Sequence, residues 1–273
     1  MSIFSLLSTP ASDDVLLFAM MLLALGLAAY LGHTSYGTLV VNDSEDTSLV
    51  SGAILSLSGL LIGFMFSLSI GGYVARGAAE IRETLVIGKA WQYAGLQMPD
   101  QRKKIETLLK AYLDDRIHFF TEDSEPGRRT WLRFSREKQH QLWREVAAEA
   151  SHNPTAVMAS VLAAYSELDA SLQETQADWR RQIPDVAWAV LILFASCASF
   201  LSGYQYRGRP GLHVFILLLP GLTALTLFVI AEIDLPGEGI IRVAPVDLRQ
   251  LASTLSDTSG RENDLPFSVH HVY

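Results

Sequence analysis

The sequence has a single cysteine and lacks strong basic character, and these two features exclude several classes of protein. Cys197 is the single cysteine among 273 residues, so no intrachain disulfide, no zinc site built on several cysteines and no CxxC redox pair can form. Acidic residues outnumber basic ones by 29 to 21, which gives a formal net charge of -8. Binding of nucleic acid requires a basic surface, so no nucleic-acid partner is expected.

Catalytic and metal-binding motifs are also absent. The histidines are dispersed, and the one close pair, His270 and His271, lies near the C-terminus. The sequence contains no HExxH motif, no phosphate-binding loop, no GxGxxG fingerprint and no nucleophile elbow. We therefore expect that the protein is not an enzyme and that it binds no metal and no cofactor.

Long apolar runs dominate what the sequence does contain. Apolar residues make up 49% of the chain and the mean hydropathy is positive, which is unusual for a soluble domain. Four runs approach or exceed the length that crosses a bilayer: 15–31, 49–74, 186–204 and 212–233. The first is the shortest, and a cleaved signal peptide is the alternative. The residues before it contain no Lys or Arg, so a retained helix is favoured.

The predicted fold class is an all-α membrane protein with a helical bundle inserted between the second and third of four spans. The expected parts are 1–75 with the first two membrane helices, 76–183 as a cytoplasmic helical domain, 184–234 with the last two membrane helices, and 235–273 as a cytoplasmic C-terminal segment with a disordered end. Arg and Lys flank the long middle segment, whereas the loop 32–47 has none, so both termini are expected in the cytoplasm. The membrane is expected to be a plasma membrane or a bacterial inner membrane.

Turn signals divide the middle segment into four amphipathic helices. The breaks are expected at 98–100, 125–127 and 153–154, with Asn153 as N-cap and Pro154 as first residue of the last helix. That helix carries an apolar seam, and its neighbours carry complementary faces. The seam consists of Met158, Val161, Tyr165, Leu168, Leu172, Thr175 and Trp179. The neighbouring faces consist of Ile105, Leu108, Leu109, Tyr112 and Leu113, and of Trp131, Leu132, Phe134, Leu142, Trp143 and Val146.

The second span is the most informative segment. Small residues recur along it at steps of three or four, a pattern that favours close helix packing within a subunit or against a neighbour. This ribbon of small residues consists of Gly52, Ser56, Gly59, Gly63, Ser67 and Gly71. Two apolar rows run beside it, and either could face lipid or line a pore. The rows are Leu60, Phe64 and Leu68, and Ile62, Phe66 and Ile70. The span has no proline before Trp91, so one long helix is expected to continue past Arg76.

Charged residues near the spans invite simple interpretations. Glu232 and Asp234 lie where the fourth span ends, and a solvated helix end is the expected explanation. Basic residues at 102–104 and 128–138 are interpreted as a solvated face paired with acids, against contact with anionic lipid. No ionisable residue lies in the middle of any span, which disfavours a proton-coupled transporter and an intramembrane hydrolase.

Residues 59–67, followed by Tyr73, Arg76 and Glu83, resemble the opening signature of the bestrophin-like domain family of membrane proteins. Residues 181–184 before the third span, with 234–236 and 239–243 after the fourth, resemble its closing signature. Bestrophins are pentameric ion channels, mostly anion-selective, in which the second membrane helix lines the pore and forms an apolar neck. The resemblance therefore implies a homo-oligomer, a pentamer by analogy, that passes small inorganic ions across the lipid bilayer. The consecutive acidic residues that bind calcium in bestrophins are missing here.

Two functions remain open at this point. The first is an oligomeric, bestrophin-like channel for small anions, with one of the two apolar rows as its neck. The alternative is a membrane-anchored scaffold or interaction protein that conducts no ions, in which the ribbon only packs helices together.

Overall fold

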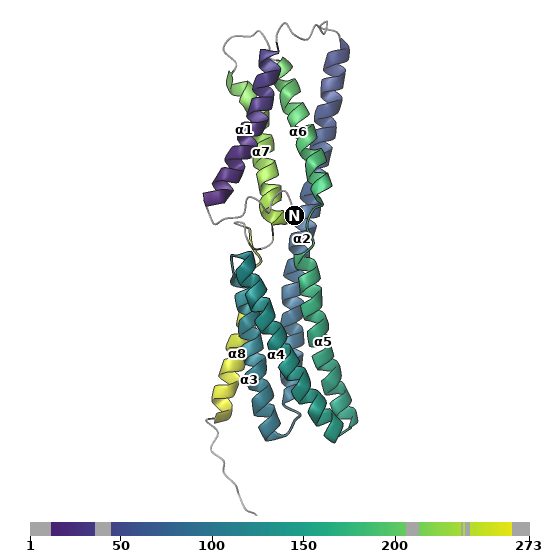
Figure 1. The fold of residues 1–273 in the computed structure, drawn as a ribbon, viewed down its shortest axis with the longest axis vertical. Helices are drawn as coiled ribbons and strands as arrows, with labels where there is room; N and C mark the ends of the chain where they lie inside the picture. The colour runs from purple at the N-terminus through teal and green to yellow at the C-terminus, as the bar shows by residue number, and fades with distance from the viewer. Residues whose placement is uncertain (1–11, 36–44, 206–212, 236, 238–240, 264–273) are drawn as a thin grey trace, which may run out of the picture. The chain divides into compact units, whose positions relative to one another are not determined.

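The computed structural model describes residues 12–35, 45–205, 213–235, 237 and 241–263, and every regular element within them is an α-helix (Figure 1). Four of these helices are long and apolar enough to cross a membrane, as the sequence predicts. The chain divides into two compact units, one formed by Met1–Val74 with Arg181–Arg242 and the other by Ala75–Arg180 with Val243–Tyr273. The expected disorder after residue 263 concerns residues outside the described part of the chain.

The first unit contains α1 (Ser12–Thr34), α6 (Asp185–Gln205), α7 (His213–Asp234) and the first part of α2 (Glu45–Ala94). Apolar side chains from all four helices meet in one core. Its fully buried members include Leu25 of α1, Met65 of α2, Leu191 of α6 and Leu227 of α7. The expected spans are confirmed as helices, each starting or ending within a few residues of its predicted limit.

Glycine brings α1 and α6 into unusually close contact. A Cβ atom on Gly32 would lie 2.0 Å from the carbonyl oxygen of Phe200, and a Cβ on Gly203 would lie 1.8 Å from that of Ala29. Both are backbone atoms, which cannot move aside as a flexible side chain can. Backbones approach this closely only where neither helix carries a side chain at the crossing, so these two positions require glycine.

The second unit contains α3 (Pro99–Thr121), α4 (Glu125–His152), α5 (Ala156–Trp179), α8 (Val246–Asn263) and the part of α2 from Ala75 onward. The expected seam of α5 is confirmed, because its members are buried apart from Trp179, which is partly buried. The expected face of α3 is also confirmed. On α4, Leu142 and Val146 are buried, but Phe134 and Trp143 are exposed, so including these two in the core was wrong.

The helix ends correct two details of the sequence analysis. Ser124 caps α4 by accepting a hydrogen bond from Gly127 N–H at 3.2 Å, so residues 125–127 form the first turn of that helix rather than a break. Thr155, not Asn153, caps α5, with its hydroxyl accepting from Met158 N–H at 3.2 Å. Asn153 instead ends α4, because the following Pro154 disfavours a helical conformation before it.

The helix α8 was not expected, since residues 235–273 were interpreted as a polar segment. Its Leu248 and Leu255 are buried in the core of the second unit, and Leu251 and Ala252 pack beside them. These four residues repeat at steps of three and four, which is the one sequence signal that indicates this helix.

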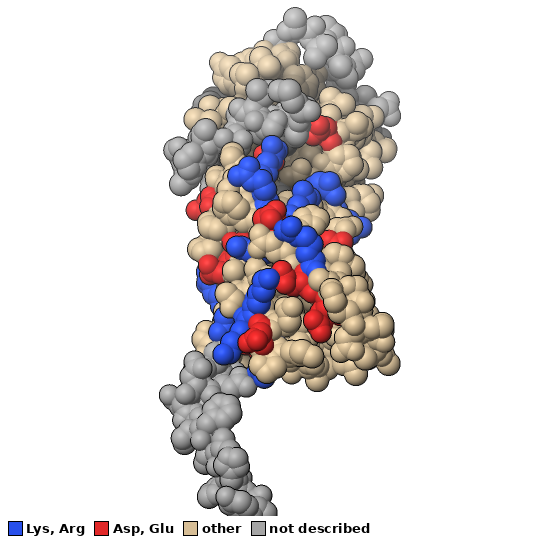
Figure 2. Space-filling model, turned by 60° about the horizontal axis from the view of Figure 1, so that its bottom comes forward, with Lys and Arg blue, Asp and Glu red and all other residues tan. Residues whose placement is uncertain are grey.

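Charged side chains of both signs are mixed over the face of the second unit that Figure 2 presents. Lys89 of α2 pairs with Glu167 of α5 at 2.5 Å, and Lys104 of α3 pairs with Glu145 of α4 at 2.7 Å. Arg129 pairs with Glu125 within α4. The favoured interpretation of the basic residues is that they pair with acids, and several of them do so. Each of these exposed pairs adds little stability.

The helix α2 belongs to both units. Its 50 residues have a length of about 75 Å, whereas the hydrocarbon core of a bilayer is about 30 Å thick. A single unbroken helix past Arg76 is confirmed. The apolar part is 49–74, and the charged side chains begin at Arg76, so we treat 49–74 as the membrane-spanning part.

Candidate functional site

The membrane-spanning part of α2 packs against its own unit along one narrow face. Ser51, Ser58, Met65 and Ser69 are each less than 5% exposed, and they recur at steps of four and seven residues. The hydroxyl of Ser69 donates a hydrogen bond to the carbonyl oxygen of Ile230 in α7, at 3.0 Å. Leu61 and Ile62 beside this face are partly buried against the same core, whereas the opposite side of the helix is left uncovered by the chain's other described residues.

The ribbon of small residues lies on the uncovered side of α2. Gly52, Ser56, Gly59, Gly63, Ser67 and Gly71 are all exposed. A Cβ atom added to any of the four glycines would meet nothing within 4 Å. Packing within the subunit, one of the two roles predicted for the ribbon, is therefore not seen among the described residues. Packing against a neighbouring molecule stays a prediction.

The two apolar rows differ in how far they are covered. In the first row Leu60 is 69% exposed, Phe64 is 61% exposed and Leu68 is 44% exposed. In the second row Phe66 and Ile70 are 37% and 40% exposed, and Ile62 packs against the core of the first unit. The first row is thus the more open of the two, and its exposure is greatest at Leu60 and Phe64.

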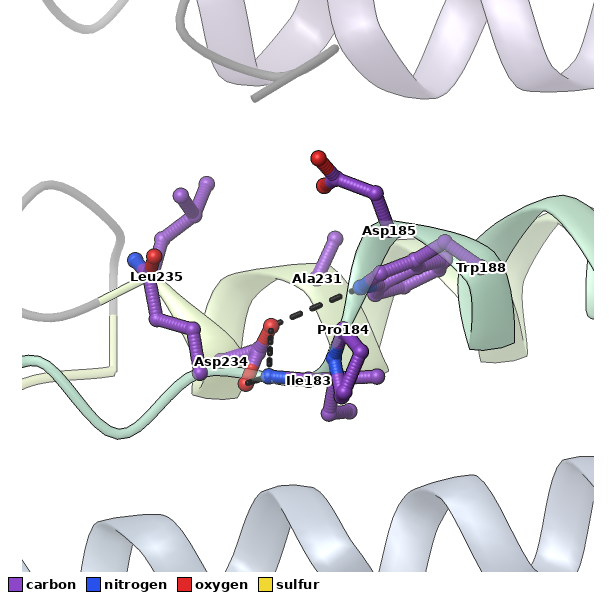
Figure 3. Close-up of a pocket in the computed structure, with 8 residues that line it drawn as sticks. Ile183, Pro184, Asp185, Trp188, Ala231, Asp234 and Leu235 are labelled. Atoms are coloured by element: carbon purple, nitrogen blue, oxygen red, sulfur yellow. Dashed lines mark hydrogen bonds between the residues drawn. The ribbon is translucent and has the colours of Figure 1, made fainter. Parts of the chain in front are cut away.

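A second feature of the first unit joins the ends of α6 and α7 (Figure 3). The carboxylate of Asp234 accepts hydrogen bonds from Ile183 N–H at 3.1 and 3.2 Å and from the indole N–H of Trp188 at 3.4 Å. A cavity of about 210 Å³ lies beside these groups. The cavity is lined by Gln182, Ile183, Pro184, Asp185, Trp188, Ala231, Asp234 and Leu235.

This arrangement corrects the interpretation of Glu232 and Asp234 as a solvated helix end. Glu232 is 2% exposed and Asp234 is 9% exposed, so both are buried. Asp234 acts as a structural acceptor that ties the start of α6 to the end of α7. The two segments of the closing signature, 181–184 and 234–236, are thereby brought together in space at Ile183 and Asp234, although about fifty residues separate them in the sequence.

The second unit contains a buried ion pair that sequence reasoning did not find. The guanidinium of Arg116 in α3 donates two hydrogen bonds of 2.8 Å to the carboxylate of Glu83 in α2, and both side chains are completely buried. The same guanidinium lies 4.3 Å from the ring centre of Phe119. Burial has the largest single effect and opposes the charge of Arg116, but Glu83, Tyr112 and Asp115 together outweigh it, so the pKa of Arg116 is raised. Burial also raises the pKa of Tyr112, which keeps that phenol neutral.

The sequence contains one hint of this ion pair, since Glu83 belongs to the opening signature, but no feature of the sequence indicated Arg116 as its partner. Among the described residues, no three His, Cys, Asp or Glu side chains lie close enough together to hold a metal ion.

Comparison with solved structures shows which fold this is. A bacterial bestrophin homologue from Klebsiella pneumoniae superimposes with a TM-score of 0.60 and 15% sequence identity, over 89% of this chain and 98% of that one. The chain has a bestrophin-like fold. A single-substitution variant of that homologue gives a TM-score of 0.59 at 15% identity, over 89% and 98% of the two chains. No model of a known protein family matches the sequence. No curated protein matches it either.

The bestrophin-like fold confirms the resemblance that the opening and closing signatures suggested, with nearly the whole chain included. It also confirms the all-α fold class with four membrane helices. The chain therefore combines a bestrophin-like fold with four helices that are long and apolar enough to cross a membrane. At this level of identity the similarity concerns the fold, and the function has to be argued from the residues of this chain.

Proposed function

We propose that the protein is an oligomeric membrane channel for small anions, with a pore lined by the uncovered side of α2. The observation that carries the proposal is the exposure of Leu60 and Phe64, the most open large side chains in the middle of that span. They lie one helical turn apart, so a ring of several copies would stack them as two successive apolar constrictions. Such constrictions regulate ion passage by excluding water.

Three further features support the proposal. Residues 49–74 contain no Asp, Glu, Lys, Arg or His, so ion passage would depend on the width and wetting of the pore rather than on a charged relay. The ribbon of small residues is exposed, and a Cβ on any of its four glycines would meet none of the described atoms within 4 Å, so this side is open to a neighbouring subunit. The bestrophin resemblance adds the expectation of a pentamer, and the distribution of Arg and Lys adds the expectation of both termini in the cytoplasm.

The first row is the better neck candidate because the second row is partly committed to the subunit's own core through Ile62. Phe64 and Phe66 provide a matched pair for testing this choice. They are the same residue type two positions apart, and at about 100° per residue they lie on opposite sides of the helix. A neck formed by the first row involves Phe64 and not Phe66.

The test is anion flux into liposomes that contain purified protein, after native mass spectrometry has counted the subunits. We expect a closed ring and measurable flux, a severalfold increase in Phe64→Ala and flux close to wild type in Phe66→Ala. The reverse order would assign the neck to the row of Ile62, Phe66 and Ile70. A monomer without flux in lipid would refute the channel and favour the scaffold, in which the exposed bundle recruits a partner.

A further inference from the structure

The part of α2 from Ala75 onward packs into the second unit through a shallow apolar surface. Three of its five buried apolar residues are alanines, and the five are Ala79, Val86, Ile87, Ala90 and Ala94. The larger Trp91 and Tyr93 are only partly buried beside them. The buried residues of α3 and α5 recur at steps of three and four, so a slide of α2 by one helical turn, about 5.4 Å, would again bring apolar side chains together. Apolar packing therefore specifies the position of α2 along its own axis only weakly.

The ion pair between Glu83 and Arg116 fits one axial position. Both of its hydrogen bonds are 2.8 Å long, and both side chains are completely buried. A slide of one turn would move the carboxylate of Glu83 away from Arg116 and leave both charges buried without a partner. The buried side chains of α3 one turn to either side of Arg116 are uncharged, and they are Tyr112, Leu113, Phe119 and Phe120. Unpaired buried charges are strongly destabilising, so the ion pair opposes a slide in either direction.

Glu80 does not provide a second position for the pair. It is buried one turn before Glu83, so a slide in one direction would bring it to Arg116. That slide would break the cap that Glu80 provides for α8, in which its carboxyl group accepts a hydrogen bond from Leu248 N–H at 2.9 Å. It would also leave Glu83 buried without a counter-charge. Arg76, which is buried on the same helix, would move together with Glu83 and stay two turns away from it.

We propose that the ion pair of Glu83 and Arg116 fixes the axial register of α2 in the second unit, a task that apolar residues of similar size would not perform. Desolvation offsets much of the attraction in a buried ion pair, whereas a polar contact in a helical core can select one register. Because α2 is one unbroken helix, a slide of its second part also moves Leu60 and Phe64 along the helix axis. This consequence for the neck rests on the proposed channel function, whereas the register itself does not.

Pulsed electron paramagnetic resonance of the full-length protein in lipid nanodiscs measures the register directly. Spin labels are attached through Arg82→Cys on α2 and Lys103→Cys on α3, both at exposed positions. Arg82 is next to Glu83, so the two labels are separated by about 20 Å along the helix axis, and a slide of one turn changes this separation by about 5 Å. Cys197→Ser removes the one native cysteine. Dilution with unlabelled protein suppresses distances between subunits.

The double variant Glu83→Leu with Arg116→Met is the decisive comparison, because it removes both charges and keeps apolar side chains in their place. We expect a single distance in the wild type and a second population, displaced by about 5 Å, in the variant. Tyr165→Phe is the matched control, since it removes an uncharged buried contact of α2, the hydrogen bond from the Tyr165 hydroxyl to the carbonyl oxygen of Ala90 at 3.3 Å. It should keep the single distance. One unshifted distance in the double variant, or an equal second population in Tyr165→Phe, would overturn the proposal.

Glu83→Met with Arg116→Met covers the case in which the first double variant does not fold, as judged by circular dichroism. Methionine adapts to irregular spaces in a core, and the same second population is expected. If neither double variant folds, the pair is required for folding itself, and its assignment to the register is wrong. None of these measurements uses ion flux, so a failure of this proposal is distinguishable from a failure of the channel function.

Discussion

The two parts of α2 pack by different means although they belong to one continuous helix. In the membrane-spanning part the buried side chains are Met65 and three serines, and the exposed side carries both large apolar residues and the ribbon of small ones. From Ala75 onward the buried face consists of apolar residues together with Arg76, Glu80 and Glu83. In the membrane-spanning part no side of the helix carries a charged residue, so hydrophobicity does not distinguish the packed face from the exposed one. In the second unit, where charged residues alternate with apolar ones, hydrophobicity does distinguish them.

The largest expected effect comes from breaking the buried ion pair between Glu83, in the part of α2 from Ala75 onward, and Arg116 of α3. Glu83→Gln leaves the guanidinium of Arg116 buried without a counter-charge, and we expect a loss of about 3–5 kcal/mol in the stability of the bundle. Thermal unfolding followed by circular dichroism, with hydrogen exchange of α3 and α5, measures this loss. Replacing both partners by apolar residues, Glu83→Leu with Arg116→Met, should restore most of it.

An exposed pair in the same unit is the control for that experiment. Arg82 and Glu174 also join α2 to a neighbouring helix, but their side chains are about half exposed. Arg82→Gln should therefore cost no more than about 1 kcal/mol. Equal losses in Glu83→Gln and Arg82→Gln would show that burial does not determine the importance of these pairs.

The next largest effect is expected where α1 crosses α6. Gly203→Ala places a Cβ against the backbone at Ala29, so the two helices must move apart, at a cost of about 1–3 kcal/mol or more. Gly63→Ala is the matched control, because a Cβ there meets nothing in its own chain. Thermal stability of the subunit should fall in the first variant only. If Gly63→Ala weakens anything, it should be the association of subunits seen by native mass spectrometry.

These cases show why the sequence predicted some features and not others. The seam of α5 could be predicted because polar residues separate its apolar ones, so the helical period is visible. The crossing at Gly32 and Gly203 could not be predicted, since glycines also recur along the membrane-spanning part of α2, where a Cβ on Gly52, Gly59, Gly63 or Gly71 would meet no described atom within 4 Å. Pairing of Glu83 with Arg116, and capping of α8 by Glu80, depend on which helices become neighbours. No local pattern encodes that choice.

The smallest effect tests the packed face of α2 in the membrane. Ser69→Ala removes the hydrogen bond to the carbonyl oxygen of Ile230, and such bonds between membrane helices contribute about 0.6 kcal/mol on average. Ser67→Ala is the control, because Ser67 lies on the exposed ribbon two residues away. We expect a small drop in melting temperature for the first variant and none for the second. A larger drop in Ser67→Ala would mean that the ribbon, and not the serine face, is the side on which α2 is held.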